Sequence, residues 1–232
     1  VSDIYLNIPY ISKRFKKEYI IPDSIKSFPV IINRCEDSGP LTKLLPTLKK
    51  ESDPNTLIIT VDDDCEYKSC LVKDLVYQMN NSTKHAFSYS GLIADKNNSK
   101  FTQPRYSYNI TVDVLQGYAG NIYRRNFFTD LNFFKNTKCF LNDDVWVSSY
   151  LRSKNIILIA LPYKPMKVNS NDTISPLHNE NDTGKITNEY KCFMELCKFF
   201  NLSDNTYEVY SSTFTNVNTF SINKKLFFRI IA

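Results

Sequence analysis

Three adjacent carboxylates, Asp62, Asp63 and Asp64, directly follow an apolar run at residues 57–61 that is typical of a buried strand. Like charges on neighbouring residues repel one another and resist burial, so the triplet needs a cation, a ring of donors or open water. A solvated turn is the ordinary alternative for an isolated acidic triplet. A cation bound by these carboxylates is the alternative that would indicate a functional site.

A second pair of carboxylates, Asp143 and Asp144, stands at the start of a helix predicted over residues 141–156. Acidic residues in a first helical turn also stabilise the helix dipole, so a purely structural role stays open. Between the two acidic motifs, Gly117 and Gly120 enclose Tyr118 and an alanine. Two glycines at this spacing indicate either a tight turn or a pocket wall that a ligand approaches closely.

The elements that must position these residues alternate between strand and helix in the first half of the chain. Strand, helix and strand in succession predict a parallel sheet, and ligands bind outside the carboxyl ends of such strands, where the acidic triplet would lie. The expected elements are strands at 4–8, 29–32 and 57–61 and helices at 41–48 and 71–79, the first helix beginning near Gly39 and Pro40.

The second half has a less regular order. A polar segment at residues 169–187, which contains His178, is predicted to be long and mobile. The tail after Asp204 is expected to form a terminal strand pair. The other expected elements are strands at 85–91 and 111–116 and helices at 141–156 and 188–201.

Composition favours one folded domain of 232 residues, with 42% hydrophobic residues. The net charge of +5 is dispersed along the chain, which argues against a nucleic-acid partner. The six cysteines show no zinc-type spacing and are expected to be reduced thiols. We expect no membrane span and, because no signal peptide opens the chain, a cytoplasmic location. The start at Val1 suggests a piece of a longer polypeptide with further domains.

Four stretches together resemble a known family: "CEDSGPLTKLLPTL", "LIITVDDD", "LQGYAGNIYRRNFF" and "NDDVWVSSYL". In this order they are similar to metal-dependent nucleotide-sugar glycosyltransferases of the GT-A fold, which carry a DxD motif. In particular, they resemble the glycosyltransferase domains encoded by large DNA viruses and by some bacterial glycan clusters. The resemblance covers residues 4–197, and a viral origin would place the protein in the host cell cytoplasm.

The resemblance implies an α/β fold with a mixed, mostly parallel sheet flanked by helices. It divides the single domain into a nucleotide-binding half at residues 1–110, an acceptor and catalytic half at 111–204, and an extension at 205–232. The implied activity is transfer of a hexosyl or deoxyhexosyl group, with a UDP-linked sugar as the expected donor and a glycan or other hydroxyl compound as acceptor.

The resemblance also implies a Mn²⁺ or Mg²⁺ site. Asp64 would bind the cation directly, Asp62 would be a second ligand or act through water, and Asp63 or Asp62 would contact the ribose hydroxyls. His178 is the candidate for a third protein ligand, although a histidine in a polar loop is more often solvated. Hard oxygen ligands suit these cations, which stabilise a departing diphosphate.

Further roles follow from the same resemblance. Pro9, Arg14, Asp37 and Lys43 would frame the base and phosphates, although Arg14 lies in a basic run that could be a solvated face. Residues 117–120, which include Gly117, Tyr118 and Gly120, would line the donor sugar and acceptor, with the Tyr118 ring available for stacking.

Asp144 would be the catalytic base of an inverting transfer, and Asp143 would orient the acceptor or the helix start. A retaining enzyme would not use Asp144 in this way. Family members more often have an aromatic residue at the position of Ser38 and a glycine at that of Ala119. Two other functions stay open: a nucleotidyltransferase, and a non-catalytic module that binds glycans or nucleotides.

Overall fold

The computed structural model describes residues 2–80, 82–104, 107–135, 139, 141–162, 166–168, 183–202 and 209–210. Its largest sheet has six strands in the order β13-β8-β11-β5-β10-β3. The strands are β3 (Leu57–Thr60), β5 (His85–Ser88), β8 (Asn109–Thr111), β10 (Asn121–Arg124), β11 (Ile157–Ala160) and β13 (Val209–Tyr210).

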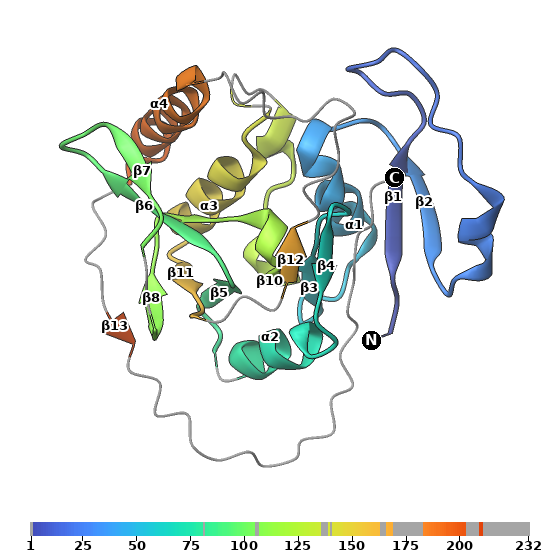
Figure 1. Cartoon of the computed structure of the whole chain (residues 1–232), viewed down its shortest axis with the longest axis horizontal. Helices are drawn as coiled ribbons and strands as arrows, with labels where there is room; N and C mark the ends of the chain where they lie inside the picture. Colours follow the sequence, from blue (N-terminus) through green and yellow to red (C-terminus); the bar gives the residue numbers. More distant parts are fainter. Residues whose placement is uncertain are drawn as a thin grey trace.

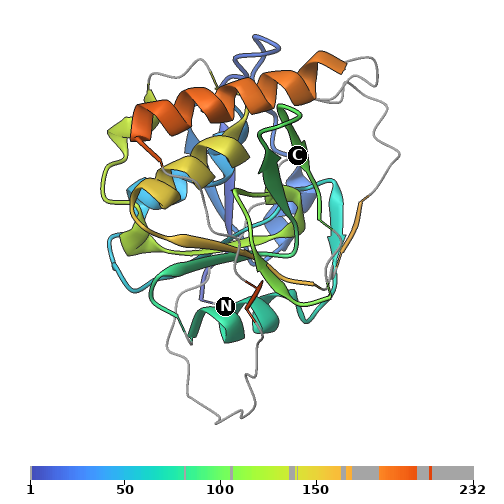
Figure 2. The same ribbon diagram turned by 90° about the vertical axis from the view of Figure 1, so that its left-hand side faces the viewer.

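Helices cover both faces of this sheet (Figure 2). Helix α2 (Leu71–Asn80) packs on one face against β5 and β10, and α3 (Asp143–Ser153) packs on the other against β11. Helix α4 (Thr183–Phe200) lies on α3 as an outer layer. No helix among the described residues is both long enough and apolar enough to cross a membrane.

A separate parallel pair, β1 (Tyr5–Pro9) and β2 (Ile31–Cys35), lies at one side of the molecule (Figure 1). The 3₁₀ helix η1 (Asp23–Ser27) interrupts their connection, and η2 (Gly39–Lys43) with α1 (Leu45–Lys50) leads from β2 towards β3. The leucines predicted for one helix face, at positions 41, 44, 45 and 48, are all buried. Leu41 lies in η2 and Leu45 and Leu48 lie in α1, while Leu44 joins the two.

Smaller pairings and 3₁₀ turns complete the described chain. Strand β6 (Gly91–Asp95) pairs with β7 (Lys100–Thr102) and β9 (Val114–Leu115), and β4 (Cys65–Tyr67) pairs with β12 (Met166–Val168). The turns are η3 (Gly117–Ala119), η4 (Arg125–Phe127) and η5 (Asn132–Lys135).

The prediction of an α/β protein with a mixed sheet flanked by helices is confirmed, but the prediction that the sheet is mostly parallel is wrong. Of the nine strand pairs described, only β1·β2 and β11·β5 are parallel. The main cause is β10, which pairs antiparallel with both β3 and β5. Gly120, with φ of 82°, provides the left-handed residue from which the chain turns into β10.

Most other element predictions hold with shifted ends. The strand predicted over 85–91 is divided into β5 and the start of β6, and the one over 111–116 is divided between β8 and β9. Helix α4 begins five residues before the predicted position 188. Most of the polar segment at 169–187 and of the tail after Asp204 lies outside the described residues.

The cysteine prediction is wrong for one pair. Cys139 and Cys192 form a disulfide with a Cα–Cα distance of 5.7 Å, which ties the residues just before α3 to α4. Their separation of 53 residues carries no recognisable spacing signal, because α4 comes to lie beside α3 only in the folded chain. Cys35, Cys65, Cys70 and Cys197 are thiols, as predicted.

Candidate functional site

Asp62 lies just beyond the carboxyl end of β3, one residue after the buried Val61. Its backbone N–H donates to the Tyr67 hydroxyl at 2.9 Å, and that hydroxyl donates to the Tyr118 carbonyl at 2.9 Å. Tyr67 therefore links the acidic triplet to the glycine-containing loop. Asp63 and Asp64, unlike Asp62, are exposed.

The Lys43 ammonium group joins the two acidic motifs. Its Nζ lies 3.1 Å from Asp62 Oδ1, 2.9 Å from Asp143 Oδ2 and 3.9 Å from Asp144 Oδ1. The Lys43 side chain is only 9% exposed. We call Lys43, Asp62, Asp143 and Asp144 the acid cluster.

The loop that contains Gly117, in the stretch "LQGYAGNIYRRNFF", contacts the acid cluster. Its backbone N–H donates to Asp144 Oδ2 at 3.0 Å. A Cβ atom at this position would lie 2.5 Å from Lys43 Nζ and 2.8 Å from Asp144 Oδ1, closer than atoms pack. Glycine is therefore required at position 117 because the loop packs tightly against Lys43 and Asp144. That this loop forms a pocket wall for a ligand stays a prediction.

The electrostatics of the cluster favour proton exchange at Asp144. Burial, followed by the neighbouring Asp143 and Asp62 charges, raises the pKa of Asp144 to about 7, although Lys43 and the Gly117 N–H oppose the shift. Burial alone would lower the pKa of Lys43, but Asp143, Asp62 and Asp144 together raise it well above its usual value. Lys43 thus stays charged, while Asp144, whose side chain is 30% exposed, can accept or release a proton near neutral pH.

A polar network that the sequence analysis missed adjoins the cluster through Tyr118. The Tyr118 hydroxyl lies 3.0 Å from Ser90 Oγ, which donates to Gln116 Oε1 at 2.8 Å and accepts from Gln103 Nε2 at 2.7 Å. Nothing in the spacing of these residues indicates the contact, since they come from three separate stretches. The network fixes the Tyr118 ring beside Gly117.

The residues expected to frame the nucleotide lie at the carboxyl ends of β1 and β2. Pro9 ends β1, and Arg14 is exposed in the turn that follows. Asp37 follows β2, and its two oxygens accept backbone N–H groups of Lys13 and Gly39, both at 2.7 Å. Asp37 therefore holds these two turns together, and its contact with a nucleotide remains a prediction, as does that of Lys43 with phosphate.

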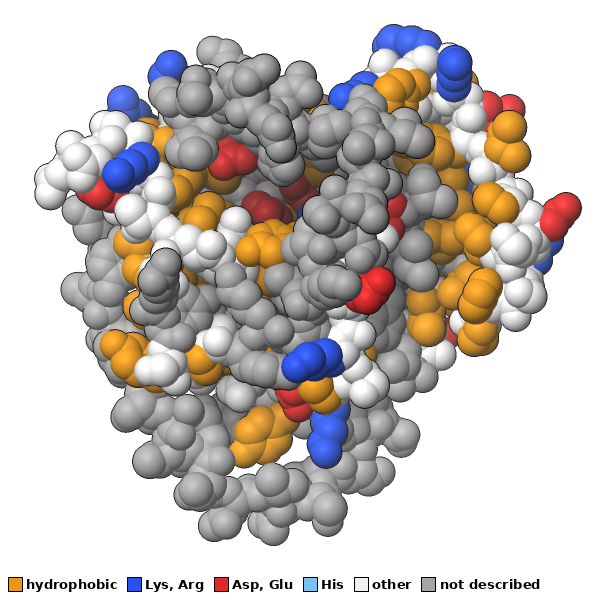
Figure 3. All heavy atoms as spheres, viewed as in Figure 1, with side chains coloured by type: hydrophobic (Ala, Val, Ile, Leu, Met, Phe, Trp, Pro, Cys, Tyr) orange, Lys and Arg blue, Asp and Glu red, His pale blue; other side chains and the backbone are white. Residues whose placement is uncertain are grey.

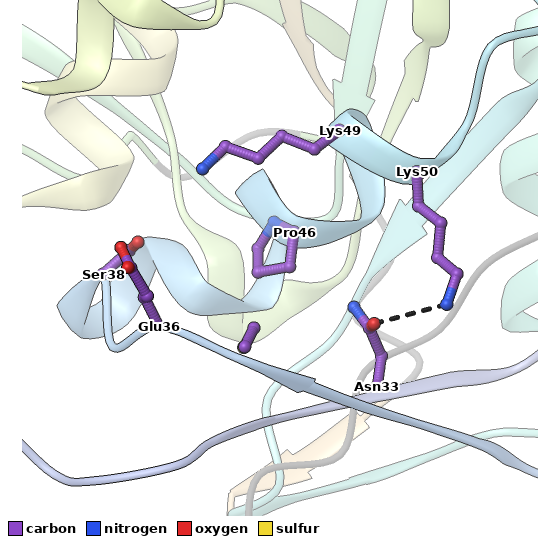
Figure 4. A pocket seen from close by; sticks show the side chains of 7 residues that line it. Asn33, Glu36, Ser38, Pro46, Lys49 and Lys50 are labelled. Atoms are coloured by element: carbon purple, nitrogen blue, oxygen red, sulfur yellow. Dashed lines mark hydrogen bonds between the residues drawn. The ribbon is translucent and has the colours of Figure 1, made fainter.

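A pocket of about 410 Å³ opens between β2 and α1 (Figure 4). Lys49 extends across it towards Glu36 and Ser38, and Lys50 Nζ donates to Asn33 Oδ1 at 3.4 Å. No residue of the acid cluster lines it, but Asp37 lies between two residues that do. The pocket thus adjoins the expected nucleotide region.

The described residues contain no group of three or more His, Cys, Asp or Glu side chains that could hold a metal ion by themselves. His178 lies outside the described residues. Asp62 and Asp64 nevertheless offer two hard carboxylates at one strand end, and a Mg²⁺ or Mn²⁺ ion commonly takes its remaining ligands from water and substrate phosphates. Asp62 Oδ1 is already paired with Lys43 Nζ at 3.1 Å, so a cation bound together with a diphosphate at this strand end stays a prediction of the family resemblance.

Comparison with known proteins assigns no family. No protein-family model matches the chain, and a search of curated proteins finds no significant match.

Proposed function

We propose that this protein is a metal-dependent glycosyltransferase that transfers a sugar from a UDP-linked donor to a hydroxyl group of a glycan or similar acceptor. One observation carries the proposal: carboxylates from the end of β3 and the start of α3 meet the Gly117 loop around Lys43. A solvated turn at residues 62–64 and a helix start stabilised by its own acidic residues would not require the two acidic motifs to lie together.

Asp144 is the proposed base. With a pKa raised to about 7, it is largely ionised just above neutral pH and can take the proton of an acceptor hydroxyl. The hydroxyl oxygen then bonds to the anomeric carbon of the donor as the bond from that carbon to the diphosphate breaks. The Gly117 N–H holds one Asp144 oxygen in place, and Lys43 fixes Asp143 beside it.

Asp62 and Asp64 are the proposed cation ligands, and the cation, when bound, supplies Lewis-acid stabilisation of the departing diphosphate. The nucleotide is proposed to lie at the carboxyl ends of β1 and β2, with Pro9, Arg14 and Asp37. The Tyr118 ring, which its hydroxyl contact with Ser90 holds in place, is proposed to pack against the sugar.

The test combines binding and turnover. Calorimetric titration with a panel of nucleotide-sugars should show binding of a UDP-linked species that depends on Mn²⁺. Asp144→Asn should keep that binding and lose transfer by at least about 100-fold, since it removes the base without changing the shape of the side chain. Glu195→Gln on the exposed face of α4 removes a carboxylate in the same way and should be fully active.

No donor binding with or without Mn²⁺ would overturn the proposal. Full transfer by Asp144→Asn would remove Asp144 as the base while leaving the donor assignment intact.

A further inference from the structure

The connection between β1 and β2 presents a strip of exposed apolar side chains. They are between 38% and 88% exposed, far more than large apolar residues in the core: Tyr10, Ile11, Phe15, Ile20, Phe28 and Ile31. Figure 3 shows apolar side chains spread over this side of the molecule, with Lys and Arg side chains at its upper end. We call residues 10–31 the basic apolar strip.

The strip also concentrates positive charge. It contains five basic and two acidic residues, a net charge of +3, against +5 for the whole chain. Both acidic side chains are engaged in ion pairs, Asp23 with Lys26 at 2.6 Å and Glu18 with Arg34 at 3.7 Å. The basic residues at positions 13, 14, 16 and 17 surround Phe15.

A defined turn holds Phe15 outward. Ser12 N–H donates to the Lys17 carbonyl at 2.8 Å, Lys16 N–H donates to the Ser12 carbonyl at 2.8 Å, and Phe15 N–H donates to Ser12 Oγ at 3.1 Å. Lys16 adopts a left-handed φ of 53°, as the tight turn requires. The Arg14 guanidinium lies over the Phe15 ring at 5.1 Å. The turn therefore displays an aromatic ring and cations together.

We propose that the basic apolar strip docks the protein on the surface of an anionic lipid bilayer. Exposed apolar side chains can enter the headgroup region, while the lysine side chains of the strip reach the lipid phosphates. The strip belongs to the segment that carries β1 and β2 at the side of the molecule (Figure 1).

Charge complementarity selects this occupant. A second copy of the chain would bring one strip of charge +3 against another, which is unfavourable unless counter-charges intervene. An anionic leaflet attracts each basic residue instead. The contact is peripheral and needs no membrane-crossing helix. It does not depend on the proposed glycosyltransferase activity.

Sedimentation with vesicles tests the proposal on the full chain. We expect binding to mixed phosphatidylcholine and phosphatidylserine vesicles at low salt, little binding to phosphatidylcholine alone, and release at high salt. The double change Lys16→Ala and Lys17→Ala should weaken the partition coefficient about 30-fold, and Phe15→Ser about tenfold.

Matched controls lie on α4, away from the strip. Phe199→Ser removes an aromatic ring that is 71% exposed, and the double change Lys191→Ala and Lys198→Ala removes two exposed lysines. These controls should bind vesicles like the unchanged protein. Circular dichroism of each variant verifies folding.

Three results would overturn the proposal. The first is absence of binding to the anionic vesicles at low salt, and the second is strip variants that bind as well as the α4 controls. The third is a concentration-dependent dimer in sedimentation velocity that Phe15→Ser dissociates, because the strip would then be the contact between two copies.

Discussion

At the scale of single residues, the acid cluster depends on one lysine that contacts three carboxylates. The sequence motifs predicted that Asp62, Asp143, Asp144 and Gly117 would share a site, and their convergence agrees with this. They did not predict that Lys43 would be the counter-ion, because its distance to each carboxylate is set by how η2 packs. The roles of Tyr67 and Ser90 were not predicted for the same reason, because the hydrogen-bond partners of a hydroxyl group are determined by the folded structure.

The raised pKa of Asp144 gives a pH dependence with a definite sign. If its ionised form is the base, kcat/KM rises with pH until Asp144 is ionised, with a midpoint near its pKa of about 7. Lys43→Met removes a charge that lowers this pKa, so the midpoint should move to higher pH. Initial rates measured across pH for both proteins check this, and an unmoved midpoint would contradict the electrostatic role of Lys43.

The raised pKa of Asp144 also makes the free energy of unfolding fall as pH rises, whereas kcat/KM increases. An aspartate whose pKa is higher in the folded state binds its proton more tightly there, so its contribution to folding is largest below the unfolded value near 4. That contribution is lost as pH rises through about 7. Asp144→Asn should therefore flatten the fall in unfolding free energy over this range, as urea titrations at several pH values would measure.

Gly117→Ala tests the close approach of the loop. The new Cβ would displace Lys43 Nζ or Asp144 Oδ1, and we expect transfer to fall about 100-fold, because small misplacements of reacting groups are costly. Gly91→Ala is the control, since the atoms nearest to its Cβ belong to the Val112 side chain, at 2.7 Å, and not to the acid cluster. It should lower the melting temperature yet leave transfer largely intact. Equal activity losses in both variants would mean a general folding defect.

At the scale of elements, helix α4 is joined to the rest of the fold by the Cys139–Cys192 disulfide. Closing a loop of this length restricts the unfolded chain, so Cys192→Ser should lower the free energy of unfolding by about 2 to 4 kcal/mol under oxidising conditions. Cys197→Ser, in the same helix, removes a thiol only and should stay sensitive to added reductant. Urea denaturation with and without reductant measures both, and an unchanged Cys192→Ser midpoint would contradict the expectation.

A buried ion pair lies between α3 and the strand region that precedes the glycine loop. Arg152 Nη1 is 3.0 Å from Asp113 Oδ1, with side chains 7% and 3% exposed, and Asp113 Oδ2 accepts the Ala94 N–H at 2.8 Å. Arg152→Met would leave a buried carboxylate without its cation, at a cost of about 3 to 5 kcal/mol. Lys26→Met breaks an exposed pair and should change little. Thermal melts compare the two, and equal effects would contradict the argument.

The sequence was a good guide to which elements exist and a poor one to how they pair. Helical spacing identified α2 and α3, and the buried leucines identified η2 and α1, because local periodicity records which side of a segment is buried. The residues within a strand do not determine whether it runs parallel or antiparallel to its neighbours. The insertion of β10 between β3 and β5 depends on contacts more than 30 residues away along the chain.

At the scale of the whole molecule, two observations bear on where the protein acts. Disulfides persist mainly in oxidising compartments, so the Cys139–Cys192 pair weighs against the cytoplasmic location expected from the sequence. The basic apolar strip would add contact with a membrane surface. Both lie outside the four motifs of the family resemblance, so the resemblance alone could not have indicated them.

The order of strands in the main sheet also has a consequence for how the chain is made. Strand β5 lies between β10 and β11, both encoded after residue 110, and among the described strands β3 pairs only with β10. A ribosome that has released only residues 1–110 has therefore produced β3 and β5 before the strands that pair with them exist. We expect β3 and β5 to stay unpaired, or bound to a chaperone, until β10 is synthesised and pairs with both of them.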